Sequence, residues 1–68
     1  MRPYYISSLP NEVLNLVFDI YFDSLMNEYQ VRTVNGGIIF KAETIKLAKH
    51  GIKIFHNADI TGSKLTAQ

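Results

Sequence analysis

The 68-residue chain contains no cysteine and no tryptophan, and it has only two histidines. Without cysteine, neither disulfides nor thiolate metal ligands can form. His50 and His56 are too few to build a structural zinc site by themselves. Proteins this small often depend on a disulfide, a metal or a second subunit, because their core alone supplies only ~3–5 kcal/mol. The missing residue types therefore leave association with a partner as the expected additional source of stability.

We expect neither a leader segment nor a membrane-spanning run. The chain starts Met-Arg-Pro-Tyr-Tyr, which lacks the apolar centre of a signal peptide. Asp19 and Asp23 interrupt the only long apolar stretch, and this excludes a membrane-spanning helix. The absence of cysteine is typical of a reducing compartment. We expect a cytoplasmic protein, in its own cell or in an infected host, with no membrane partner.

Charge is unevenly distributed along the chain. Residues 1–30 contain one arginine and four acidic residues, whereas residues 31–68 contain six basic and two acidic residues. The two halves could be solvated faces that attract each other across the fold. Alternatively, the basic half could bind nucleic acid or an acidic protein. The candidate nucleic-acid contacts are Arg32, Lys41, Lys46, Lys49 and Lys53.

Residues 10–29 have a pattern that predicts a long helix. Pro10 suits the first helical turn, and Glu12 adds the negative charge that is favoured there. Polar residues recur every four positions and would form one narrow stripe: Asn15, Asp19, Asp23 and Asn27. The rest of the helix surface would be apolar. This apolar arc would be much wider than the ~100° arc that a surface helix normally buries.

The surplus of apolar helix surface predicts a partner. The candidate contacts are Phe18, Tyr21, Phe22, Leu25 and Tyr29. Burying one such side chain contributes roughly 1.5–3 kcal/mol, so leaving several in water would be costly for a small domain. We expect another protein or a second copy of the chain, in a homodimer around a two-fold axis, to cover them.

The second half of the chain predicts shorter elements. Asn35-Gly36 between the β-branched runs 31–34 and 38–40 indicates a type I′ hairpin, with positive φ at both residues. Residues 41–50 predict a short helix that ends at Gly51 in a left-handed cap. Residues 52–55 alternate like a strand.

The expected fold is one α+β domain over residues 1–60, followed by a polar C-terminal tail over residues 61–68. Its order is a long N-terminal helix, a β-hairpin, a short helix and a final strand. Residues 2–7 could form an edge strand or an arm. If they form a strand, the order becomes βαββαβ, as in ferredoxin-like sheets.

No motif indicates catalysis, a cofactor or a metal. The serines lie in no Gly-x-Ser-x-Gly elbow, and Thr61-Gly62-Ser63-Lys64 lacks the first glycine of a phosphate loop. Asp19 and Asp23 stand on the solvated stripe, where no pocket would shift their pKa. The spacing of His50, His56 and Asp59 matches no metal motif. We therefore expect a protein without enzymatic activity, cofactor or metal.

Residues 9–18, Leu-Pro-Asn-Glu-Val-Leu-Asn-Leu-Val-Phe, resemble the opening of an F-box, the segment that docks on the adaptor of cullin ubiquitin ligases. The resemblance implies partner contacts at Leu9, Pro10, Val13, Leu14, Val17 and Phe18. It covers only this segment, because no tryptophan follows and residues 35–37 indicate a hairpin where the family has its later helices.

Together these features favour a small non-enzymatic protein-binding module, such as a phage- or virus-encoded inhibitor or adaptor, that acts through the apolar face of the long helix. A small nucleic-acid-binding protein that uses the basic C-terminal half is the alternative. An F-box-like adaptor of a ubiquitin ligase is the second alternative.

Overall fold

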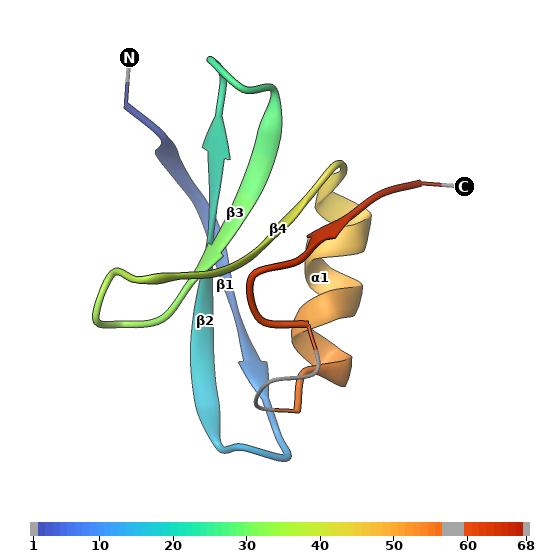
Figure 1. The fold of residues 1–68 in the computed structure, drawn as a ribbon. Helices are drawn as coiled ribbons and strands as arrows, with labels where there is room; N and C mark the ends of the chain where they lie inside the picture. Colours follow the sequence, from blue (N-terminus) through green and yellow to red (C-terminus); the bar gives the residue numbers. More distant parts are fainter. Residues whose placement is uncertain (1, 57–59, 68) are drawn as a thin grey trace.

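A computed structural model describes residues 2–56 and 60–67 of the chain. Four strands form an antiparallel meander, and a helix and a short strand follow (Figure 1). The elements are β1 (Tyr4–Asn11), β2 (Leu16–Asp23), β3 (Glu28–Arg32), β4 (Ile38–Ala42), α1 (Ile45–Ile54) and β5 (Lys64–Leu65). The strands lie in the sheet in chain order, and β5 pairs with β4 in parallel.

The long helix predicted over residues 10–29 is wrong, and with it the helix-led α+β fold and the ferredoxin-like order. This segment forms the end of β1, all of β2 and the start of β3. A polar residue at every fourth position lies on one face of a helix, but it also lies on one face of a strand, because four is a multiple of two. The spacing therefore could not separate the two structures.

Two turns of the same design interrupt the segment, twelve residues apart in the sequence. In the first, the Asn11 side-chain oxygen accepts from the Leu14 amide at 2.8 Å, and Asn15 has φ 55°. In the second, Asp23 accepts from the amides of residues 25 and 26, and Asn27 has φ 54°. Asparagine tolerates this left-handed conformation, which cannot continue a right-handed helix. The two turns therefore produce a meander.

The hairpin between β3 and β4 is present, but its turn differs from the prediction. Val31 pairs with Phe40, and the connecting loop spans residues 33–37. The Gly36 amide donates to the Thr33 carbonyl at 2.9 Å, and Gly36 has φ 87°. Asn35 does not have a positive φ, so the type I′ turn is wrong. A turn followed by one left-handed glycine is the usual design of a slightly longer hairpin loop.

Helix α1 begins and ends later than predicted. The Thr44 side chain caps it by accepting from the Leu47 amide at 3.1 Å. Gly51 is not a cap but a buried residue inside the helix, where an added Cβ would lie 2.7 Å from the Phe40 ring. The strand predicted over residues 52–55 is wrong. Ala48 and Ile52 share the buried face of α1, as helical spacing requires, and Phe55, the residue that follows the helix, is buried as well.

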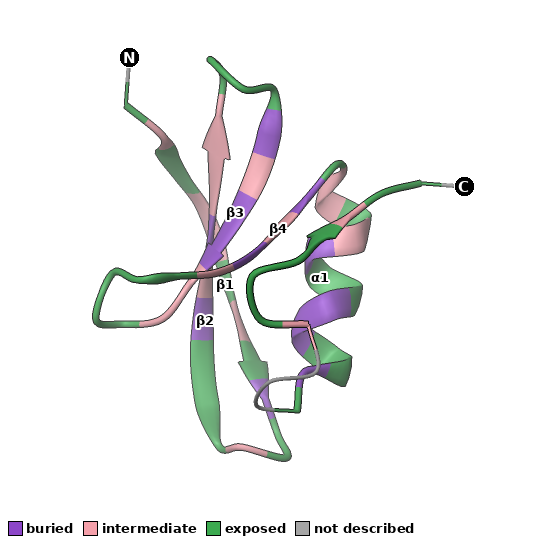
Figure 2. Ribbon diagram, viewed as in Figure 1, coloured by how far each residue is buried: buried purple, intermediate pink, exposed green. Residues whose placement is uncertain are grey.

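The core lies between α1 and one face of the sheet (Figure 2). Its buried apolar residues are Phe18, Ile20, Val31, Phe40, Ala42, Ala48, Ile52 and Phe55. Phe55 packs edge-on against Phe18, with ring centres 5.3 Å apart, and also stacks on Phe40. Within the predicted tail, the Glu43 amide donates to the Leu65 carbonyl at 2.8 Å, which holds β5 at the sheet edge.

Candidate binding surface on α1 and β1

The solvent face of α1 carries a row of basic side chains, the cations Lys46, Lys49 and Lys53 together with His50. Spacings of three and four residues place these side chains on one face of the helix, and all four are exposed. The row extends about 10 Å along the axis, since each residue adds ~1.5 Å. None of the four forms an ion pair with a carboxylate in the described part of the chain, where the ion pairs both belong to Glu28.

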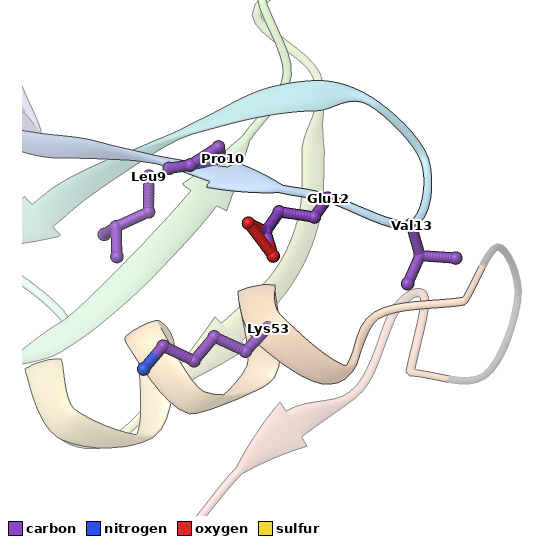
Figure 3. A pocket seen from close by; sticks show the side chains of 5 residues that line it. All are labelled: Leu9, Pro10, Glu12, Val13 and Lys53. Carbon is purple, nitrogen blue, oxygen red and sulfur yellow. The ribbon is translucent and has the colours of Figure 1, made fainter.

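A groove adjoins this basic face (Figure 3). It has a volume of about 440 Å³ and lies between the end of β1 and the last turn of α1. Its lining consists of Leu9, Pro10, Glu12, Val13 and Lys53. Leu9 also packs against the core, while Val13 is 66% exposed in the turn. Apolar side chains therefore form most of the lining, and one acidic and one basic side chain are also part of it.

Asn11 connects the two walls of the groove. It is buried, and its side-chain amide donates to the carbonyls of Ile52 at 2.7 Å and Phe55 at 2.9 Å. The carbonyls at the end of a helix have no partner within the helix, so this contact satisfies two of them. Its oxygen simultaneously accepts from the Leu14 amide. One side chain thus fixes the β1–β2 turn against the end of α1.

Sequence reasoning assigned no role to Asn11. The sequence does contain one indication of the turns. Asn11-x-x-x-Asn15 and Asp23-x-x-x-Asn27 have the same spacing of short polar residues, which indicates two equivalent turns. That repeat predicts where the turns lie, because short polar side chains accept from nearby amides there. The hydrogen bonds from Asn11 to the end of α1 depend on tertiary packing, so no local sequence pattern predicts them.

On the face of the sheet that points away from α1, most charged side chains have an ion-pair or hydrogen-bond partner. Direct cross-strand partners point to the same face, which places Asp19, Tyr21, Gln30, Arg32, Lys41 and Lys64 together there. We call this the outer face. Arg32 donates to the Gln30 side-chain oxygen at 2.6 Å and lies 4.5 Å above the Tyr21 ring. The Gln30 amide in turn donates to Asp23 at 3.2 Å.

Glu28 is the most deeply buried ionisable group of this network. Its carboxylate lies 3.1 Å from Lys64 Nζ and 3.2 Å from Lys41 Nζ. Burial alone would raise the pKa of Glu28, but the ammonium groups of Lys64 and Lys41 outweigh it and lower the pKa below 4.5. Glu28 therefore holds β3, β4 and β5 together as an anion.

The five predicted partner contacts do not share one surface. Phe18 is buried in the core, and Tyr21 lies on the outer face beneath Arg32. Phe22 and Tyr29 are half-buried and pack against each other, with ring centres 4.9 Å apart. Leu25 is 78% exposed in the β2–β3 turn. The apolar helix face that was expected to unite them does not exist.

The predicted nucleic-acid contacts fall into two groups. Lys46, Lys49 and Lys53 lie together on α1. Arg32 and Lys41 lie on the outer face, where Gln30 and Glu28 engage them. Residues 9–18, which resemble an F-box opening, form the tip of the β1–β2 hairpin. The structure therefore brings together only three of the five predicted cations.

The described residues contain no group of three potential metal ligands among histidine, aspartate and glutamate side chains. Asp59, the carboxylate considered beside His50 and His56, lies outside them. No helix in the described part of the chain is long and apolar enough to cross a membrane. The chain matches no protein-family model, no curated protein and no solved structure.

Proposed function

We propose that the protein is a small non-enzymatic binding module that binds an acidic segment of another protein through the basic face of α1. One observation carries the proposal: the cations of α1 are exposed and lack carboxylate partners in the described chain, whereas Glu28 engages Lys41 and Lys64 on the outer face. Unpaired charges of one sign attract a partner of the opposite sign and increase its rate of association.

The expected affinity is modest and depends on salt. An exposed ion pair contributes only ~0.2–1 kcal/mol, because both partners remain well hydrated. Three lysines therefore support weak binding by charge alone. Exposed charges are also screened over a distance of roughly 8 Å at physiological ionic strength. An acidic ligand should consequently bind most tightly in dilute salt and dissociate as salt is added.

Nucleic-acid binding is the second candidate function, since lysine also binds phosphate as a point charge. The same three lysines of α1 would make the contacts. Two observations favour a protein ligand instead. The sequence pI of about 8.0 lies below the ~9 that is typical of dedicated nucleic-acid-binding domains. The groove beside the lysines also offers an apolar surface, which a phosphate backbone would not use.

A titration with defined ligands tests the proposal. A fluorescent glutamate decamer, a serine decamer and a twenty-nucleotide single strand are titrated separately at low salt. We expect the glutamate peptide to bind at least tenfold more tightly than the serine peptide, and Lys49→Gln to weaken it several-fold. Arg2→Gln removes the same charge from an exposed residue outside α1 and is the control. Equal binding of the two peptides would contradict the proposal, and tighter binding of the oligonucleotide would favour the second candidate.

A further inference from the structure

The groove and the basic face form one continuous surface, because Lys53 belongs to both. It lines the groove together with Leu9, Pro10 and Val13. It also lies in the row of cations with Lys46 and Lys49. A ligand held by the lysines therefore has apolar surface within reach of its neighbouring residues. Figure 3 shows this arrangement, with the Lys53 side chain on α1 and the apolar side chains on β1 and its turn.

Exposed apolar side chains extend the groove onto the hairpin tip. Val13 is exposed in the turn, and Leu16 and Val17 are about half exposed at the start of β2. Leu16 pairs directly with Asn11, whose side chain bonds to the end of α1, so Leu16 lies on the side of the hairpin that faces the helix. Val17 pairs with Pro10 and lies on the outer face. Contiguous exposed apolar surface next to a groove is typical of an interaction site. The volume of about 440 Å³ falls in the range of pockets that hold ligand groups, ~300–1,000 Å³.

The charged side chains around the groove indicate which class of ligand it binds. The lining contains one carboxylate, Glu12, and one ammonium group, Lys53, and two further ammonium groups, Lys46 and Lys49, lie beside it. We propose that the groove binds an apolar side chain of a linear acidic segment, whose carboxylates pair with the lysines of α1. This inference rests on the proposed function and adds the ligand class: an acidic segment with a large apolar residue in its middle.

A second copy of the chain fits this surface less well. A two-fold contact through the groove would bring the basic faces of two helices towards each other, and their lysines would repel. Pairing through the edge of β1 is also hindered. The register of β1 shifts between Tyr5 and Ser7, and Pro10 lacks an amide hydrogen. Bulges and prolines are devices that keep edge strands from pairing with other chains.

The groove is also held in place before a ligand arrives. Asn11 fixes the hairpin turn to the carbonyls of Ile52 and Phe55, and Leu9 is anchored in the core. The two walls therefore keep their relative position without a ligand. A preformed site loses less conformational freedom on binding, so even a small apolar contact adds measurable affinity.

Two peptides separate the groove from the charges. One is acetyl-Glu-Glu-Glu-Leu-Glu-Glu-Glu-amide, and the other has serine in place of leucine. We expect the leucine peptide to bind the wild-type protein about tenfold more tightly, as partial burial of a leucine side chain allows. Val13→Ser should remove this advantage and leave the affinity for the serine peptide unchanged. The matched control is Val34→Ser, because Val34 is 79% exposed in the β3–β4 loop, away from the groove.

Glu12→Gln provides a second variant that leaves the apolar lining intact. It should increase the affinity for both peptides several-fold, because it removes the carboxylate of the lining. Equal affinity of the wild-type protein for the two peptides would overturn the groove inference. If Lys49→Gln still weakened both peptides in that case, the proposed function would stand. Failure of both peptides to bind at low salt would overturn the proposed function as well.

Discussion

The outer face of the sheet and the solvent face of α1 carry similar numbers of cations in different surroundings. On the outer face, Arg32 is bound by Gln30, and Lys41 and Lys64 contact the buried Glu28. On α1, three lysines and a histidine are exposed without a carboxylate partner in the described chain. Paired charges hold strands together, whereas unpaired charges remain free to meet a ligand. The comparison therefore separates a surface that supports the fold from one that is available for binding.

The largest effect on stability is expected beneath the groove. Asn11→Ala removes a buried side chain that bonds to three backbone groups, two of them at the end of α1. We expect a loss of about 2–4 kcal/mol, because buried carbonyls lose their donors. Denaturant unfolding measures it, with Asn35→Ala in the exposed β3–β4 loop as the matched control. A loss no greater than that of the control would show that Asn11 does not fix the groove.

The outer face should be the next most sensitive region. Glu28→Gln keeps the shape of the side chain but leaves Lys41 and Lys64 without their anion. Because both lysine side chains are partly exposed, water compensates in part, and we expect a loss of about 1.5–3 kcal/mol. Lys49→Gln is the comparison on α1 and should change stability by less than about 0.5 kcal/mol. Equal losses for the two variants would remove the distinction between the faces.

Acid should affect the two faces differently. The pKa of Glu28 is lower in the folded chain than in the unfolded one, so its contribution is present above about pH 4.5 and is lost as pH falls through the folded pKa. Stability measured from pH 6 to pH 3 should therefore decline more steeply in the wild-type protein than in Glu28→Gln. Parallel pH profiles would contradict the role of Glu28 as a buried anion.

The smallest stability effect should accompany the largest loss of binding. Replacing Lys46, Lys49 and Lys53 together by glutamine removes repulsion between like charges spaced three and four residues apart. Such repulsion costs only a few tenths of a kcal/mol per pair, so we expect unchanged or slightly higher stability. The same variant should lose nearly all affinity for the glutamate peptide. A clear loss of stability would show that the lysines support the fold instead.

The sequence allowed the later part of the meander to be predicted better than its beginning. Asn35-Gly36 correctly indicated a hairpin, since a left-handed glycine is needed there, although the positive φ belongs to Gly36 alone. The first two hairpins were missed because Pro10 and Glu12 resemble a helix start and a four-residue polar repeat fits both helix and strand. The turn residues Asn15 and Asn27 carried the deciding information.

Part of the candidate site could be predicted from the sequence and part could not. Lys46 and Lys49 could be selected from the sequence as possible contacts because they lie three residues apart in a predicted helix. Lys53 was selected on a predicted strand, and it joins them because α1 continues to Ile54. The contacts of Lys41 with Glu28 and of Arg32 with the Tyr21 ring could not be predicted, because they depend on strand register. The groove could not be predicted either, because it forms where Leu9 and Lys53, far apart in the sequence, approach each other in the fold.

Backbone amide chemical shifts recorded during a titration with the leucine-containing acidic peptide compare both faces in one experiment. If the exposed cations of α1 and the adjoining groove form the binding surface, the largest changes will occur at residues 9–13 and 46–53. The amides of the outer face, including Tyr21, Arg32 and Lys41, will change little. Largest changes on the outer face, with α1 unaffected, would contradict the account.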